Sequence, residues 1–165
     1  MSCIAFYTCS PLRDHPGSEQ VQGFFDMLPE VFAEADEEAG CLGHIREKPL
    51  GWPLSAQDWG RWGEYRIPSF YADGPQERAR RVTATISIWV DVDAVRRFAY
   101  NGAHGAALEN RADWFEATEY PQYVMWWIED GVTPTWRDCA CKLEALNENG
   151  ATQDAFDFAN VYPAP

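Results

Sequence analysis

The stretch Tyr123-Val-Met-Trp-Trp-Ile128 decides the fold. Apolar side chains occupy both its odd and its even positions. Because successive side chains of a strand point to opposite faces of the sheet, this pattern predicts a strand that is buried on both faces. The helices predicted elsewhere suffice for only one face, so the other face would need a partner such as a second copy of the chain.

The rest of the sequence predicts the elements around this strand. Residues 82–90, VTATISIWV, alternate apolar residues with Thr83, Thr85 and Ser87, which is the pattern of a strand. Further strands are predicted at residues 4–8, 41–47 and 155–158. Helices are predicted at residues 18–40, with a kink at Pro29, at 91–117, and from a start at 133–136 to 149. The order β-α-β-β-α-β predicts the α+β class: a ferredoxin-like antiparallel sheet with helices on one face.

One segment is not explained by this pattern. Residues 49–75 carry four prolines, four glycines and the tryptophans Trp52, Trp59 and Trp62, without clear periodicity. A connection this long is usually functional or disordered, and its aromatic content argues against disorder. We therefore expect a single domain, residues 1–165, with an aromatic-rich insertion or lid at about 49–81, whose tryptophans could wall a pocket or anchor a core.

Charge and composition exclude several classes of protein. A net charge of −13 disfavours binding to nucleic acid or to anionic membranes. The sequence has no run of apolar residues long enough to cross a bilayer and no signal peptide, so a cytoplasmic protein is expected. Five cysteines, an odd number, predict free thiols and not a disulfide framework.

The predicted helix at 91–117 carries the candidate site. A rotation of roughly 100° per residue places five side chains on one stripe, with Ala107 and Trp114 at its edge. The stripe consists of Tyr100, His104, Leu108, Arg111 and Phe115. A solvated face would be less aromatic, and a plain core face would not hold both histidine and arginine. The stripe therefore predicts an apolar pocket with a few polar groups.

The polar residues of the stripe suggest catalytic roles. His104 could exchange a proton near neutral pH, Tyr100 could donate a hydrogen bond, and Arg111 could hold an oxyanion or carboxylate. The equally simple alternative is a satisfied buried histidine and an arginine in an ion pair. The expected substrate-binding residues are Trp114, Phe115, Leu108, Trp89, Trp126 and Trp127, although Trp126 and Trp127 point to opposite sides of their strand.

Several runs of sequence resemble one known family. They are Ser87-Ile-Trp-Val-Asp91, Phe98-Ala-Tyr-Asn-Gly-Ala-His104, Arg111-Ala-Asp-Trp-Phe115, Met125-Trp-Trp-Ile128, Gly131-Val-Thr-Pro-Thr135 and Ala155-Phe-Asp-Phe158. Together they are similar to the domain-of-unknown-function family DUF3291. The resemblance implies a dimeric α+β barrel, related in architecture to antibiotic-biosynthesis monooxygenases, polyketide cyclases and haem-degrading enzymes, and hence a homodimer.

Metal and nucleotide chemistry have little support in the sequence. Cys41 and His44 lack the paired spacing of a zinc site, so no metal is expected. Cys139 and Cys141 point about 200° apart on a helix, which predicts one buried and one partly exposed thiol. Glycine-rich phosphate loops and hydrolase motifs are missing from the sequence.

Three functions remain open. The first is a cofactor-independent enzyme of secondary metabolite biosynthesis, in which His104 is the acid/base for oxygenation, cyclisation or isomerisation of a hydrophobic, aromatic or polyketide-like metabolite. The second is a haem protein with His104 as axial ligand. The third is a dimeric, non-catalytic module that binds a hydrophobic ligand.

Overall fold

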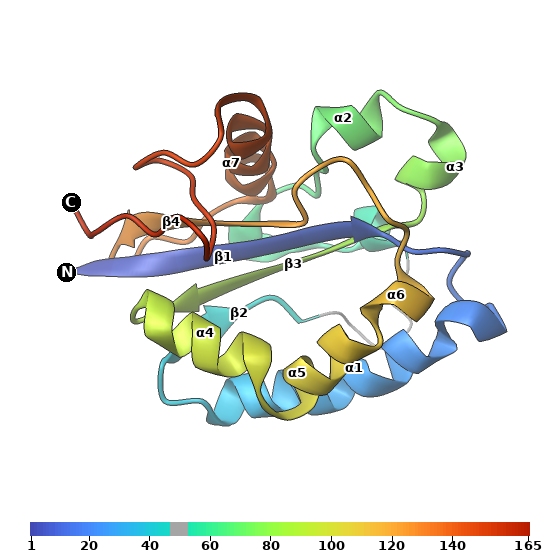
Figure 1. The fold of residues 1–165 in the computed structure, drawn as a ribbon, viewed down its shortest axis with the longest axis horizontal. Helices are drawn as coiled ribbons and strands as arrows, with labels where there is room; N and C mark the ends of the chain where they lie inside the picture. The colour runs from blue at the N-terminus through green and yellow to red at the C-terminus, as the bar shows by residue number, and fades with distance from the viewer. Residues whose placement is uncertain (47–52) are drawn as a thin grey trace.

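The computed structural model describes residues 1–46 and 53–165. The sheet consists of β1 (Ser2–Pro11), β2 (Cys41–His44), β3 (Val82–Trp89) and β4 (Tyr123–Glu129). Its strand order is β2-β3-β1-β4, and all neighbouring strands are antiparallel (Figure 1). This is the ferredoxin-like order, so the predicted α+β class and antiparallel sheet are confirmed.

Helices cover both faces of the sheet. One face packs against α1 (Glu19–Glu37), α4 (Val92–Tyr100), α5 (Gly102–Glu109) and α6 (Arg111–Trp114). The other lies beneath α7 (Trp136–Asn149) and a segment that contains η1 (Leu54–Ala56), η2 (Gly60–Trp62), α2 (Ser69–Ala72) and α3 (Gln76–Ala79). Figure 1 shows the first group below the sheet and α7, α2 and α3 above it.

The expectation of helices on one face, and of a second copy on the other, therefore needs correction. β4 is buried on both sides as predicted, with Val124 and Met125 both fully buried. The covering residues come from the same chain, because α7 and residues 53–79 bury the face that was expected to need a partner. A homodimer is thus not required by an uncovered sheet face and stays a prediction.

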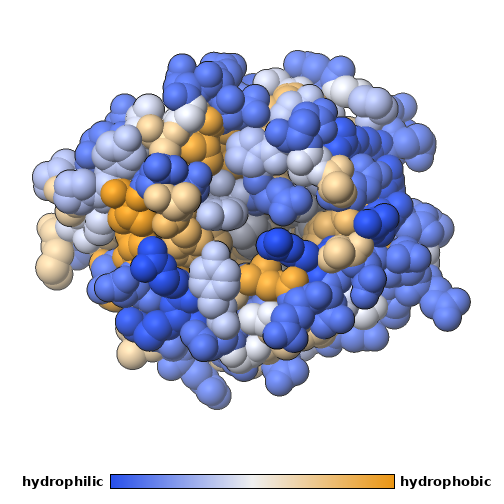
Figure 2. Space-filling model, viewed as in Figure 1, coloured by the Kyte–Doolittle hydropathy of each residue, from blue (hydrophilic) through white to orange (hydrophobic). Residues whose placement is uncertain are grey.

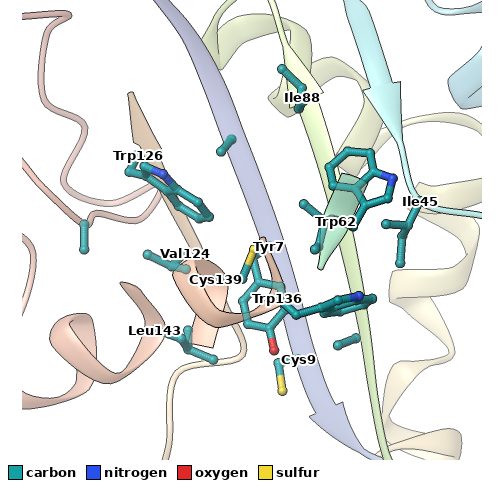
Figure 3. Close-up of a cluster of buried hydrophobic side chains, with 14 of the residues drawn as sticks. Tyr7, Cys9, Ile45, Trp62, Ile88, Val124, Trp126, Trp136, Cys139 and Leu143 are labelled. Carbon is teal, nitrogen blue, oxygen red and sulfur yellow. The ribbon is translucent and has the colours of Figure 1, made fainter. Parts of the chain in front are cut away.

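The core on this second face is rich in aromatic residues (Figure 3). Trp136, fully buried, packs edge to face against Tyr7, Trp59 and Tyr65, with ring centroids 6.4, 5.2 and 4.9 Å away. Trp62 belongs to the same core. Trp59 and Trp62 of the expected 49–81 insertion are therefore part of this core and do not line a pocket on the face covered by α1, α4, α5 and α6. Residues 49–52 of the expected insertion, Trp52 among them, lie outside the described residues.

The helix predicted at 91–117 is three helices, α4, α5 and α6. The first break lies at Asn101, whose backbone is extended (φ −127°, ψ 173°), and at Gly102, whose φ is +56°. A second break lies at Asn110. Glycine can take a positive φ without a steric penalty, so Gly102 permits a sharp change of direction that the helical spacing of its neighbours conceals.

The remaining predicted elements are present with changed bounds, and residue 47 of the strand predicted at 41–47 lies outside the described residues. α7 begins with a capping box, in which the Thr135 hydroxyl accepts from the Asp138 backbone N–H and the Asp138 carboxylate accepts from the Thr135 N–H. The strand predicted at 155–158 is a single bridge, in which Phe156 exchanges two backbone hydrogen bonds with Met125. This bridge places the C-terminal segment along the free edge of β4.

Candidate functional site

A cavity of about 660 Å³ lies between the sheet and the helices of the first face. Its floor is the face of β1 and β3 that carries Phe6, Thr8, Thr83, Thr85 and Ser87. Its walls come from α1, α5 and α6. In the view of Figure 2, apolar patches interrupt the hydrophilic surface over the junction of the sheet with α4 and α5. The volume falls within the range of small-molecule sites.

The floor carries a row of small hydroxyl groups. The hydroxyls of Thr8 and Thr85 face each other across β1 and β3 at 2.6 Å. Along β3, Ser87 accepts a hydrogen bond of 2.7 Å from the indole N–H of Trp89. These residues alternate with the apolar side chains of the opposite core, so the strand pattern itself directs hydroxyls into the cavity. The floor can thus hydrogen-bond a ligand without presenting a charge.

His104 is held in one orientation. Its Nδ1 lies 2.8 Å from the backbone carbonyl oxygen of Ala99, and its ring packs 4.9 Å from that of Phe98. A carbonyl can only accept, so Nδ1 carries the proton and Nε2 of the neutral ring keeps a lone pair. No residue in the described ranges hydrogen-bonds Nε2.

The surroundings also set the charge state of His104. Burial is the largest influence and lowers the pKa of the imidazole, since a cation is poorly solvated there. The Ala99 carbonyl and the Glu34 carboxylate oppose this effect and raise the pKa. The pKa of His104 is lowered overall, so the imidazole is neutral at neutral pH. When it takes a proton, the Ala99 carbonyl and the Glu34 carboxylate stabilise the cation.

Glu34 positions the helix that carries His104. Its Oε2 accepts a hydrogen bond of 2.7 Å from the backbone N–H of Ala103 in the first turn of α5. Asn101, at the N-cap position of α5, makes no such bond, because its side chain instead donates to the Arg97 carbonyl. A carboxylate from α1 thus caps α5 from outside the helix.

Arginine side chains lie at the α6 end of the cavity. Nε of Arg13 donates to the Ala112 carbonyl oxygen over 2.6 Å, which ties the end of β1 to α6. Arg111, exposed at the first position of α6, makes no hydrogen bond or ion pair with any described residue. The carboxylate in this part of the lining, Glu116, is neutralised by Arg78 and Arg81, at 3.1 and 2.7 Å.

A second histidine, His44 on β2, also lines the cavity. Its ring stacks on Phe32, with centroids 5.6 Å apart and an interplanar angle of 5°. Nδ1 lies 2.7 Å from the Ile45 carbonyl oxygen and Nε2 lies 2.8 Å from a carboxylate oxygen of Asp36. Both nitrogens of His44 are engaged by residues of the protein, so neither is available to a ligand, unlike Nε2 of His104.

The structure brings most of the predicted site residues together. Those that line the cavity are Tyr100, His104, Leu108, Arg111, Trp114, Phe115 and Trp89. Tyr100 is 55% exposed and lies at the rim. They do not form one continuous helical stripe, because the break at Asn101 turns α5 relative to α4. Their shared location comes instead from three short helices along one face of the sheet.

Two predicted binding residues lie elsewhere. Trp126 is buried in the core of the opposite face, and the indole N–H of Trp127 donates to the Tyr162 carbonyl oxygen over 2.8 Å. Trp127 thus packs beneath the C-terminal segment, outside the cavity lining.

Sequence reasoning missed Arg13, His44 and the hydroxyl row. Only the hydroxyl row had a visible signal, the alternation of hydroxyl and apolar residues in β3.

The described residues contain no group of three or more histidine, cysteine, aspartate or glutamate side chains that could hold a metal ion. Cys139 is buried and Cys141 is exposed, as their helical spacing predicted. Among the helices of the described part of the chain, none is both long and apolar enough to cross a membrane.

Residues 3–165 match the family described as "Domain of unknown function (DUF3291)", and the chain belongs to that family. The resemblance seen in the sequence is therefore confirmed. No curated protein matches the chain.

Several solved structures are similar at low identity. A protein of unknown function from Nitrosomonas europaea is 13% identical, with a TM-score of 0.45 over 81% of this chain and 93% of its own. A Pseudomonas aeruginosa protein is 11% identical, with a TM-score of 0.46 over 80% and 97%. SnoaB, a cofactor-independent oxygenase from Streptomyces nogalater, is 12% identical, with a TM-score of 0.42 over 81% and 97%. At these values an activity does not transfer from those proteins to this chain.

Proposed function

We propose that this protein is an acid/base enzyme that acts on a hydrophobic, aromatic metabolite and that His104 is its base. The observation that carries the proposal is the free Nε2 of His104, in an apolar cavity large enough for a drug-sized molecule. The lowered pKa of His104 keeps this nitrogen unprotonated at neutral pH. A general base needs both properties: a free lone pair within reach and the right protonation state.

The first step is removal of a proton from the substrate. Nε2 of His104 takes a proton from an acidic C–H or O–H group, and the electron pair stays on the substrate as an enolate or phenolate. The Ala99 carbonyl and the Glu34 carboxylate stabilise the resulting imidazolium. Tyr100 is the proposed donor to the anionic oxygen, because it lines the same cavity.

The later steps follow from the enolate. Return of the proton from Nε2 to a different carbon is an isomerisation. Attack of the carbanion on a carbonyl of the same molecule is a cyclisation: a C–C bond forms, the C=O π bond breaks, and the resulting alkoxide takes the proton from Nε2. Both balance without another reactant. An oxygenation would need dioxygen as a second substrate to accept the electrons of the carbanion. Isomerisation and cyclisation are therefore the simplest reactions for this site.

The base can be tested with 5-nitrobenzisoxazole before the natural substrate is known. Removal of its ring C–H proton breaks the N–O bond and leaves the electron pair on a coloured phenolate. We expect the protein to accelerate this elimination, with a rate that rises with pH through a midpoint below the ordinary histidine pKa of 6.5 and then levels off. His104→Gln should lower the protein's rate constant by about 100-fold or more.

His15→Gln is the matched control, because His15 is an exposed histidine outside the cavity lining. The control should match wild type in rate. If His104→Gln also matches wild type, His104 is not the base and the proposal is wrong. If the protein binds aromatic ligands but accelerates no proton transfer, it is a binding module.

Haem binding is a second candidate, because a histidine with an Nδ1–H bonded to a carbonyl and a free Nε2 also suits an axial ligand. Mixing the protein with hemin should then give a Soret band that is lost in His104→Gln. Absence of this band, or its persistence in the variant, would remove this candidate. The expected homodimer stays a prediction beside either function.

A further inference from the structure

We propose that Arg13 and Arg111 form an anion clamp and that the ligand of the cavity is an apolar molecule with an anionic group at one end. The term anion clamp refers to these two guanidinium groups at the α6 end of the cavity. The inference rests on the proposed function, because it names the substrate class of the same cavity.

The arginines are available for a ligand. Arg111 has no hydrogen-bonding or ionic partner in the described part of the chain, and only Nε of Arg13 is bonded there, to the Ala112 carbonyl. That bond fixes Arg13 beside α6, whose first residue is Arg111. The terminal nitrogens of both groups can therefore donate to a carboxylate, sulfonate or phosphate.

Charge elsewhere in the lining supports the same ligand. The protein carries a net charge of −13, yet the cavity lining contains a single carboxylate in the described residues, Glu116. Arg78 and Arg81 neutralise Glu116. Because its own carboxylate is already paired, the cavity offers two unpaired cations and no free anion, and this charge pattern selects for anionic ligands.

The base and the clamp lie on different helices that line the same cavity. His104 is on α5, and Arg111 is on α6, beyond the break at Asn110. Leu108, Phe115 and the hydroxyl floor line the same cavity, whose volume is about 660 Å³. The ligand therefore has an apolar body of a size that this cavity admits, with its acidic C–H or O–H group apart from its anion.

Two fluorescent dyes that differ in one group can test the clamp. 8-Anilinonaphthalene-1-sulfonate and N-phenyl-1-naphthylamine share one ring system, and only the first has an anionic group. We expect wild type to bind the sulfonate more tightly, and high salt to weaken only the sulfonate. Arg111→Gln should raise the Kd of the sulfonate by about tenfold, and the double variant Arg13→Gln/Arg111→Gln should raise it further. In both variants the Kd of the neutral dye should stay within about twofold of its wild-type value.

Arg137→Gln is the matched control, because Arg137 is an exposed arginine on α7, across the sheet from the cavity. Displacement of the neutral dye by the sulfonate, and loss of both in Leu108→Trp, would place both dyes in the cavity. Equal Kd values for the two dyes in wild type, or an effect of Arg111→Gln no larger than that of Arg137→Gln, would overturn the clamp.

The clamp and the base can fail separately. A protein that eliminates 5-nitrobenzisoxazole through His104 but binds both dyes equally would retain the base and lose the clamp. A protein that discriminates between the dyes through Arg111 but performs no elimination would retain the clamp and lose the base.

Discussion

The carboxylate of Glu34 on α1 accepts a hydrogen bond of 2.7 Å from the backbone N–H of Ala103, one residue before His104. This contact joins two segments 69 residues apart in sequence. It satisfies an N–H group that the first turn of α5 leaves without a partner inside the helix. It also places a negative charge near His104. The same side chain thus fixes the position of the proposed base and favours its protonated form.

Substitutions at Glu34 should separate these two effects. Glu34→Ala removes the cap and should lower the free energy of unfolding in urea by about 1 kcal/mol. Glu34→Gln keeps an oxygen acceptor but removes the charge, so it should retain most of the stability and lower the pKa of His104. An NMR titration of the imidazole measures that shift, and Glu37→Gln, an exposed position on the same helix, is the control. An unchanged pKa in Glu34→Gln would show that Glu34 acts only as a cap.

Gly102 should tolerate substitution poorly. Its φ is +56°, and a Cβ there would lie against the Glu34 carboxylate. Gly131 has a similar backbone, with φ +82°, but a Cβ would meet no atom within 4 Å. Gly131→Ala should therefore cost only the backbone strain, about 1 kcal/mol, and Gly102→Ala clearly more. Equal losses of unfolding free energy in the two variants would mean that α1 and α5 move apart at no cost.

The sequence predicted these local features unevenly. The alternation in β3 was readable because each of its residues faces either a core or the cavity floor, and the capping box of α7 lies within four consecutive residues. The break at Gly102 had one local signal, the Asn101-Gly102 dipeptide that is typical of turns, whereas the contact of this turn with Glu34, far away in sequence, had none. Neighbouring residues on both sides have helical spacing, so local periodicity alone predicts one continuous helix.

Long-range contacts also explain the errors and omissions at the site. Arg13 reaches the cavity through a bond to Ala112, 99 residues away, and no local pattern signals that pairing. Trp59 and Trp62 were candidates for the pocket because tryptophan suits both cores and binding sites. Trp59 packs against Trp136 on α7, and Trp59 and Trp62 both belong to the core on the face of the sheet that α7 covers.

The stability of the protein should depend on pH through His104. Burial lowers the pKa of His104 in the folded chain below its ordinary value of 6.5. As the pH falls below 6.5, His104 is therefore protonated to a larger extent in the unfolded chain than in the folded chain. This difference stabilises the unfolded chain, so the free energy of unfolding falls as the pH falls. The loss ends once the pH is below the folded pKa.

His104→Gln tests this dependence. The variant lacks the titrating group, so it should lose less unfolding free energy than wild type when the pH is lowered from about 8 to about 5. His15→Gln, which changes an exposed histidine, should show no such shift from wild type. A constant difference between His104→Gln and wild type at the two pH values would mean that His104 titrates equally in the folded and unfolded chains.

The hydroxyl pair on the cavity floor offers a double-mutant test. Thr8 and Thr85 lie 2.6 Å apart, and each is the other's partner across the strands. Thr85→Val leaves the Thr8 hydroxyl without that partner and should lower the free energy of unfolding by about 1 kcal/mol, and Thr8→Val should do the same. The double variant replaces both hydroxyls with methyl groups of the same shape and should lose much less than the sum of the two. Additive losses would mean instead that each hydroxyl is satisfied by water or by a bound ligand. The floor would then be more accessible to a polar ligand than the direct hydrogen bond suggests.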